Sequence, residues 1–415
     1  MTSEPKNISR QYIIIIAVSI LCILLVNLHP WLGSNMIADE IYHQRQIEMF
    51  QEGDFAQQPD LTTLPGYHWG IYLLMIPIGA TGLNPLRIAG SLLGLAAVFL
   101  FDICYRTLHG SPHPQRTLQF FLLPILFPWF FLLYTDAFAI TVLLLAAYFW
   151  LRERHVWAAG AGAALFYVRQ PVVVFVFILA LIDLLEYVRA NRQTLSLNVL
   201  GRWFLRGWPY LLLLVGCAGF FLINGGFAVG DTDSHPGGVV GWDNVTFSAW
   251  MTFLFIWPLV IGRFGDGLQL LLHKHGSLGR ILGFIGVVIA FASVFFFDPT
   301  HPYNALAGTL HNGFILWANS IGFGRLWLAI PIVLLSLALT QIHFKSTTHY
   351  VIYFGWLISL IPFWLVEPRY SIPAFAVWLL FVPPLDDLAE SRLSLNFAAL
   401  SMILFSGMLL GVLFP

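Results

Sequence analysis

The chain has 415 residues, of which 58% are hydrophobic and only 10% are charged, and its mean hydropathy is +0.79. Soluble domains carry about 25% charged residues, so this composition excludes an ordinary soluble protein and predicts an integral membrane protein surrounded by lipid. The net charge of −1 gives no indication of a nucleic-acid surface, and the three cysteines lie in apolar runs that predict neither a disulfide nor a metal site.

The chain begins with an apolar segment, 12–30, that is preceded by Lys6 and Arg10 and so resembles a secretory signal peptide. This segment is longer than the apolar region of a signal peptide, which has about 7–15 residues, and no small-residue cleavage site follows it. We therefore predict that it is a retained first transmembrane helix.

Further apolar segments follow along the chain. A transmembrane helix needs about 20 apolar residues, although helices packed inside a bundle can be shorter. The segments that we predict to cross are 88–105, 118–134, 137–151, 156–168, 172–188, 207–224, 249–263, 281–297, 322–341, 350–366, 371–385 and 395–414. With 12–30 they predict an all-α, polytopic transmembrane bundle of about thirteen spans that forms a single domain over residues 1–415.

The segment 67–80 is ambiguous because it is short and follows Pro65-Gly66. If it does not cross, fifteen of the twenty Lys and Arg residues lie in the cytoplasm, as the positive-inside rule requires. If it does cross, every later loop changes sides and the charge asymmetry is inverted. We therefore predict a juxtamembrane or re-entrant helix in an outer loop that covers 31–87.

The first polar motif is Asp39-Glu40, followed by His43, directly after the first predicted span. Carboxylates at a membrane edge are costly unless they are hydrated, paired or used in function. A carboxylate in a partly desolvated cleft suits a general base for a sugar hydroxyl. The alternative is an interfacial acidic pair in which Asp39 caps a helix over 40–50.

Two more polar motifs lie at outer ends of predicted spans. Tyr134-Thr135-Asp136 and Arg169-Gln170-Pro171 face the same compartment. An Arg fork binds phosphate well, although Arg169 could simply pair with Asp136. The Gly-rich block from Asn224 to Asp231, with His235 after it, could hold a substrate or a metal, and a solvated loop is the alternative.

A last polar motif, Glu367-Pro368-Arg369-Tyr370, lies between two predicted spans. An Arg at membrane depth indicates function by default. Because Glu367 and Arg369 are two positions apart across a proline, they cannot form a helical pair, and we expect each to face a different partner. His301 and His311 are too loosely spaced to indicate a metal site, and Asn244-Val245-Thr246 is a glycosylation sequon on the predicted outer side.

In their order along the chain, these motifs closely resemble the dolichyl-phosphate-glucose-dependent α-1,2-glucosyltransferase family, which has a GT-C fold. The matching stretches are Asp39 to His43 with Gln46 and Phe50, Gly53 to Phe55, Thr62 to Gly66, Tyr134 to Asp136, Arg169-Gln170, Asn224 to Gly226 with Gly230, Asp231 and His235, and Glu367 with Arg369-Tyr370. An Asp-Asn-Arg-His-Tyr block typical of the family is missing after His301-Pro302-Tyr303-Asn304, which leaves open a distant, prokaryotic relative.

The resemblance implies a monomeric, inverting transferase that moves glucose or a similar hexose from a polyprenyl- or dolichyl-phosphate sugar to a glycan or lipid-linked acceptor. It implies no cofactor and no metal, because Arg and His side chains can stabilise the departing phosphate. The active site would face the lumen of the endoplasmic reticulum in a eukaryote, and the periplasm or exterior from the plasma membrane in a prokaryote.

The resemblance also implies roles for individual residues. Asp39 is expected to be the catalytic base, with Glu40 as its alternate or as an acceptor-orienting partner. The donor phosphate is expected to contact Arg369, Arg169, His301 and His311. The sugars are expected to contact His43, Asp136, Gln170, Asp231, His235, Glu367 and Tyr370.

Two rival functions remain on the sequence alone: a transporter or flippase of a lipid-linked saccharide, and a structural membrane subunit. Transporters usually show repeated halves and broken helices near the bilayer midplane. This chain shows no repeat, and its polar motifs cluster at one membrane face. The enzyme hypothesis predicts that Asp39, Arg169 and Arg369 converge on one outer cavity.

Overall fold

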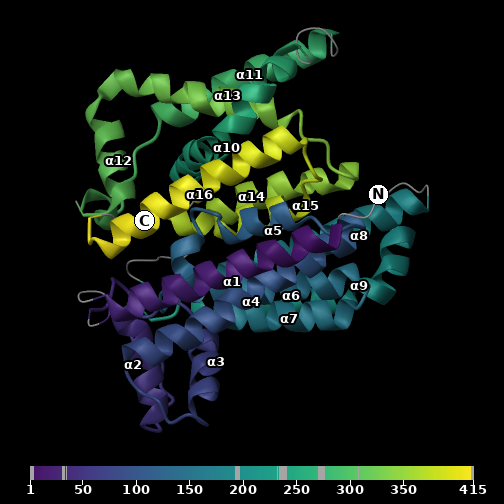
Figure 1. Cartoon of the computed structure of the whole chain (residues 1–415). Helices are drawn as coiled ribbons and strands as arrows, with labels where there is room; N and C mark the ends of the chain where they lie inside the picture. The colour runs from purple at the N-terminus through teal and green to yellow at the C-terminus, as the bar shows by residue number, and fades with distance from the viewer. Residues whose placement is uncertain are drawn as a thin grey trace.

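In the computed structural model, the described residues are 4–29, 33, 35–191, 197–230, 232, 241–269, 276–306 and 308–412. This part of the chain forms sixteen α-helices joined by short 3₁₀ helices and loops (Figure 1). The all-α prediction is confirmed. The longer helices of the first half are α1 (Glu4–Leu28), α4 (Leu83–His109), α6 (Thr135–Leu151), α7 (His155–Val168), α8 (Val174–Ala190) and α9 (Leu197–Asn224). The second half contains α10 (Asp243–Gln269), α11 (Gly276–Phe295), α12 (Leu310–Ser320), α13 (Ala329–Leu339), α14 (Val351–Leu360), α15 (Ile372–Phe381) and α16 (Asp387–Leu409).

Seven helical segments of the described chain are long and apolar enough to cross a membrane, so the chain is an integral membrane protein. They are Arg10–Leu28, Leu83–His109, Gln170–Ala190, Leu197–Asn224, Asp243–Gln269, Gly322–Leu339 and Asp387–Leu409. Shorter apolar helices lie at Thr135–Leu151, His155–Val168 and Phe284–Phe295. The total of about thirteen spans stays a prediction.

The segment 118–134, expected to be one span, is not a continuous helix. Helix α5 (Pro114–Phe121) ends early, and a 3₁₀ helix η1 (Phe127–Phe130) follows it. Pro124 and Pro128 lack the backbone N–H that a helix interior needs, which explains the break. Every residue of the segment after the half-buried Leu118 is buried, so neighbouring helices rather than lipid surround its irregular backbone.

The first outer loop contributes α2 (Glu40–Gln51) and α3 (Gly66–Met75), which project from one end of the bundle (Figure 1). Helix α3 has ten residues and is therefore about 15 Å long, half of the roughly 30 Å needed to cross the hydrocarbon core. The structure thus contains no crossing helix between α1 and α4 among its described residues. This agrees with the expectation that 67–80 does not cross.

The loops sort into two groups at opposite ends of the helices, as this topology requires. At one end, Lys345 Nζ lies 3.0 Å from the Leu108 carbonyl, and Arg189 donates to Ser346 Oγ over 2.8 Å. At the other end, Arg369 reaches Asp39. Loops predicted to be cytoplasmic therefore meet each other, and loops predicted to be outer meet each other. Which end faces the cytoplasm stays a prediction.

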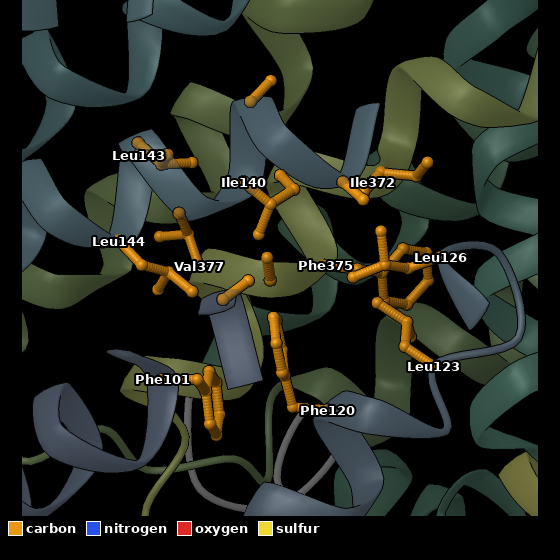
Figure 2. Packing of buried hydrophobic residues seen from close by; sticks show 14 of the residues in the cluster. Phe101, Phe120, Leu123, Leu126, Ile140, Leu143, Leu144, Ile372, Phe375 and Val377 are labelled. Atoms are coloured by element: carbon orange, nitrogen blue, oxygen red, sulfur yellow. The ribbon is translucent and has the colours of Figure 1, made fainter. Parts of the chain in front are cut away.

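The core lies where α4, α5, α6 and α15 meet (Figure 2). The rings of Phe101 and Phe120 stack with centroids 4.3 Å apart, and every residue of α15 is buried. A Cβ added to Gly94 would lie 2.7 Å from the Ala137 Cβ, so α4 and α6 approach each other through small residues. This dense packing fixes the helix ends on which the polar residues sit.

Candidate active site

A cavity of about 900 Å³ lies beside the start of α2. Its wall is built by residues from the first outer loop, from the segment that joins α7 to α8, from the loop before α12 and from the α14–α15 connection. Eight predicted site residues line it: Asp39, His43, Arg169, Gln170, His311, Glu367, Arg369 and Tyr370. Asp39, Arg169 and Arg369 converge on one cavity, as the enzyme hypothesis requires.

Asp39 sits in a tight turn before α2 that the Tyr134 hydroxyl and the Glu40 carboxylate hold in place. Ala38 has φ +47°, a left-handed backbone conformation that residues other than glycine rarely adopt. The Tyr134 hydroxyl accepts from the Asp39 N–H over 2.9 Å and donates to the Ile37 carbonyl over 3.0 Å. Within the described residues the Asp39 carboxylate forms no cap hydrogen bond with α2. It is oriented instead by Arg369 in the cavity wall.

Glu40, the adjacent carboxylate, points the other way into the protein. It is fully buried against the equally buried Arg87, whose Nε donates to Glu40 Oε1 over 2.9 Å. The Leu133 and Ile37 backbone N–H groups each donate to this carboxylate over 2.8 Å. Glu40 therefore accepts a full set of hydrogen bonds from protein groups and does not line the cavity.

Arg369 contacts three carboxylates of the site. Its Nη2 donates to Glu367 Oε2 over 2.8 Å and lies 3.4 Å from Asp39 Oδ2, and its Nη1 lies 3.9 Å from Asp136 Oδ2. Its guanidinium also lies over the ring of Trp129 at 5.1 Å. Burial alone would lower the pKa of Arg369, but these carboxylates hold it well above its usual value. The site thus keeps a permanent cation on its wall.

The expectation that Glu367 and Arg369 face different partners is wrong, because they pair with each other. Glu367 has an extended backbone, with φ −143° and ψ 132°, before the 3₁₀ turn that begins at Pro368. In extended backbone, residues two apart point to the same side. Burial alone would raise the pKa of Glu367, but Arg369 holds it below its usual value.

Arg169 forms the ion pair with Asp136 that was the simpler alternative, and it still lines the cavity. Its Nη1 donates to Asp136 Oδ2 over 3.1 Å and to Thr135 Oγ1 over 2.8 Å. Within the described part of the chain, its other guanidinium nitrogens form no hydrogen bond with protein. Asp136 lies behind the two arginines and does not line the cavity. Arg169 can therefore bind an anion without giving up this pair.

Of the two histidines predicted to contact the donor phosphate, only His311 lines the cavity. His311 lines the cavity, and among the described residues its Nδ1 has no hydrogen-bond partner. Burial lowers the pKa of His311 although Glu367 opposes the shift, so the ring is neutral at neutral pH. His301 lies behind the wall, where its ring packs on Trp364 at 4.7 Å and its Nδ1 accepts from the Tyr303 N–H.

The Gly-rich block reaches the first outer loop. The Val229 N–H donates to the Thr62 carbonyl over 3.0 Å, and Gly230, at φ +71°, lies against the Pro59 and Leu61 carbonyls. Gln170 lines the cavity and donates to the Phe227 carbonyl over 3.0 Å. Asp231 and His235 lie outside the described residues. Two sequence-distant loops therefore form one side of the cavity.

A family model described as the DIE2/ALG10 family matches residues 34–380, which includes every residue that lines the cavity. The chain belongs to the DIE2/ALG10 family. The relative from Drosophila melanogaster, named Dol-P-Glc:Glc(2)Man(9)GlcNAc(2)-PP-Dol alpha-1,2-glucosyltransferase, is 27% identical over 71% of this chain and 70% of its own length. Relatives of the same name from Arabidopsis thaliana and Mus musculus are 24% and 25% identical, over 88% and 83% of this chain and 91% and 83% of their own.

A solved structure also matches this DIE2/ALG10 chain. ArnT from Cupriavidus metallidurans bound to undecaprenyl phosphate is 16% identical, covers 97% of this chain and 76% of its own, and superposes with a TM-score of 0.39. The family model confirms the resemblance that the sequence motifs indicated.

Other residues that shape the site of this DIE2/ALG10 member were not assigned from the sequence. Asn244 donates to the Phe363 carbonyl over 3.0 Å and accepts from the Glu367 N–H over 3.1 Å, and Asn304 binds both backbone groups of Val366. The Asn244 side chain is thus buried and engaged, which excludes the glycosylation suggested by the sequon in this folded state. Both asparagines lie at the start of a helix, Asn244 in α10 and Asn304 in the 3₁₀ helix Pro302–Ala305, so no local sequence signal identifies the extended segment that they bind.

Proposed function

We propose that the chain is an inverting glucosyltransferase that moves glucose from a dolichyl- or other polyprenyl-phosphate donor to a lipid-linked oligosaccharide. One observation carries this proposal: in a DIE2/ALG10 chain, Asp39 shares a cavity with two arginines that come from distant elements. The relatives' names supply the donor and the acceptor. The transporter alternative receives no support from any relative.

Asp39 is the best placed general base. Its carboxylate faces the cavity, with its side chain about half exposed, and the Tyr134 hydroxyl anchors its backbone. In the proposed reaction, an acceptor hydroxyl attacks the anomeric carbon, its proton passes to Asp39, and the bond to the lipid phosphate breaks with inversion. Glu40, held by Arg87, acts instead as the structural support of this turn.

Arg169 is the best placed phosphate ligand, because its guanidinium keeps donors that no described protein group uses. His311 can add a neutral hydrogen bond to the phosphate from the same wall. Arg369 is surrounded by Glu367, Asp39 and Asp136, so its main effect is to hold Asp39 near the reacting atoms. Positioned cations of this kind stabilise the charge that develops on a departing phosphate.

We also propose the features of the enzyme that rest on its family resemblance alone. These are a GT-C architecture, a site on the non-cytoplasmic face, a location in the endoplasmic reticulum if the source is eukaryotic, action as a monomer, and catalysis without a metal. The loops predicted to be cytoplasmic carry fifteen of the twenty Lys and Arg residues, which supports the outer placement of the site.

The test is transfer of labelled glucose from a short-chain polyprenyl-phosphate glucose to a lipid-linked oligosaccharide by the purified chain. Asp39→Asn should lower kcat at least about 100-fold, since a positioned base contributes about 10²–10⁴-fold. Glu52→Gln, an exposed carboxylate at the end of α2, is the matched control and should retain full turnover. Unchanged turnover in Asp39→Asn would remove Asp39 as the base.

A further inference from the structure

A pair of buried histidines beside the cavity takes no part in the charged network. His43 lies on α2 and His68 on α3, and the two are 5% and 0% exposed. Nδ1 of His43 lies 2.9 Å from Nε2 of His68, and the rings are inclined by 29°. At this distance one nitrogen carries a proton and the other accepts it, so the contact fixes the tautomers of both rings together.

Both rings are neutral at neutral pH. Burial lowers the pKa of His43 well below its usual value, and His68, Arg369 and Arg169 lower it further. Burial lowers the pKa of His68 to about 3. The only other titratable rings packed on His43 within the described residues are the phenols of Tyr67 and Tyr134, and the nearby Glu40 is neutralised by Arg87.

The position of the shared proton depends on the second nitrogen of His68, Nδ1. This nitrogen is buried and has no hydrogen-bond partner among the described residues, while the Pro65 carbonyl, an acceptor, is the backbone group that raises the pKa of the ring against the effect of burial. If Nδ1 of His68 carries its proton, its Nε2 is the acceptor and His43 Nδ1 is the donor. The remaining nitrogen of His43, Nε2, is then a lone pair, and His43 lines the cavity.

We infer that His43 Nε2 is a neutral acceptor for a sugar hydroxyl in the cavity and that His68 is the positioning residue that fixes this tautomer. The inference rests on the proposed function and deepens it. A carboxylate in place of His43 would also accept from a hydroxyl, but it would add negative charge beside the lipid phosphate. A neutral imidazole accepts without repelling that anion, which explains why the ring is kept buried and uncharged.

The first test compares two substitutions of similar size at His68. His68→Gln keeps an oxygen that can accept from His43 Nδ1, whereas His68→Leu removes it. We expect kcat/KM to fall by about 10-fold or more in His68→Leu and by less than about 3-fold in His68→Gln, since an unpaired buried polar group and a free tautomer weaken a hydrogen bond. Equal losses in the two variants would overturn the inference.

The second test identifies the hydroxyl. A set of deoxyglucosyl donors and a set of acceptors with one deoxygenated terminal glucose are each assayed with the wild type and with His43→Leu. One deoxy substrate should be poor for the wild type and cause no further loss in His43→Leu, and its set tells whether the hydroxyl belongs to donor or acceptor. If every deoxygenation lowers kcat/KM by the same factor in His43→Leu as in the wild type, His43 contacts no hydroxyl and the inference is refuted.

A pH profile separates positioning from packing. In His68→Glu, a carboxylate beside His43 Nδ1 stabilises the imidazolium, so Nε2 becomes a donor. Turnover relative to the wild type at the same pH should therefore be lowest at low pH and recover at high pH. A loss that does not depend on pH would indicate packing alone and overturn the role of His68. The ¹⁵N shifts of His43 in the wild type test the tautomer without substrate, and a protonated Nε2 would refute it.

The same experiments keep the two proposals apart. If the wild-type chain transfers no glucose, the proposed function fails, whatever tautomer the ¹⁵N shifts show. If the wild type transfers glucose and the His68 variants behave alike, only the present inference fails.

Discussion

Glu40 and Asp39 are neighbouring carboxylates, and the structure predicts opposite phenotypes for their amide variants. Glu40→Gln keeps the shape of the side chain but removes the charge that faces Arg87, and both side chains are 0% exposed. It also places an amide donor against backbone N–H groups of Ile37 or Leu133 that now donate to the carboxylate. Breaking a buried ion pair by changing one partner costs about 3–5 kcal/mol, so we expect a loss of that size in the free energy of unfolding.

The assay is thermal or denaturant unfolding of the purified protein in detergent, followed by turnover measured well below the unfolding midpoint. Glu40→Gln should unfold earlier yet keep measurable turnover, whereas Asp39→Asn should unfold normally and lose turnover. The double variant Glu40→Gln/Arg87→Met removes both charges and should be more stable than Glu40→Gln alone. A Glu40→Gln variant with wild-type stability and no turnover would refute the structural role and make Glu40 a catalytic candidate.

Four further outcomes are expected. Arg169→Ala should raise the KM for the donor at least about 10-fold, since a charge-assisted hydrogen bond is worth about 1.5–3 kcal/mol. The donor KM of Arg169→Lys should lie between those of the wild type and Arg169→Ala. An unchanged donor KM in Arg169→Ala would exclude Arg169 from phosphate binding. Tyr134→Phe leaves the Asp39 N–H unpaired and removes one of the two hydrogen bonds to the Ile37 carbonyl, so it should lower kcat about 10-fold with little change in acceptor KM. A wild-type kcat would show that the turn holds without the hydroxyl. Because the pKa of Glu367 is below its usual 4.5 in the folded state, its ionisation stabilises the fold above that pH and the contribution is lost as pH falls, so the unfolding midpoint of Glu367→Gln should drop less steeply below about pH 5 than that of the wild type. Gly230→Ala places a Cβ against the Pro59 and Leu61 carbonyls at φ +71° and should lower the free energy of unfolding by about 1–3 kcal/mol. Gly53→Ala is the control for backbone strain alone, because Gly53 has a positive φ but no close neighbour, and it should cost less.

The sequence allowed prediction of what depends on local pattern. Polar groups at the ends of apolar segments identified Asp39, Arg169 and Arg369, and charge asymmetry identified the segment 67–80 as non-crossing. Both kinds of signal are local or additive along the chain. The sequence also contained the signal for the break in 118–134, because Pro124 and Pro128 each remove a helical hydrogen bond within one turn of each other.

The roles that were missed depend on partners far away in the chain. Glu40 is separated from Arg87 by 47 positions, and nothing in the Asp39-Glu40 motif indicates which carboxylate has a buried cation behind it. His68 gains its significance only when α3 folds back on α2. The pairing of Glu367 with Arg369 was missed for a different reason. It depends on the extended backbone of Glu367, which helix spacing rules do not describe.

Asp39 and Arg369 meet across 330 positions of sequence, and this distance has a consequence for biosynthesis. The arginine emerges from the ribosome only after most of the helices, and it is held in place by α15, whose ten residues are all buried by earlier segments. A nascent chain that ends before residue 369 therefore carries Asp39 without the cation that positions it. The charged pair is therefore completed late in synthesis, when the segment that carries Arg369 packs against helices made before it.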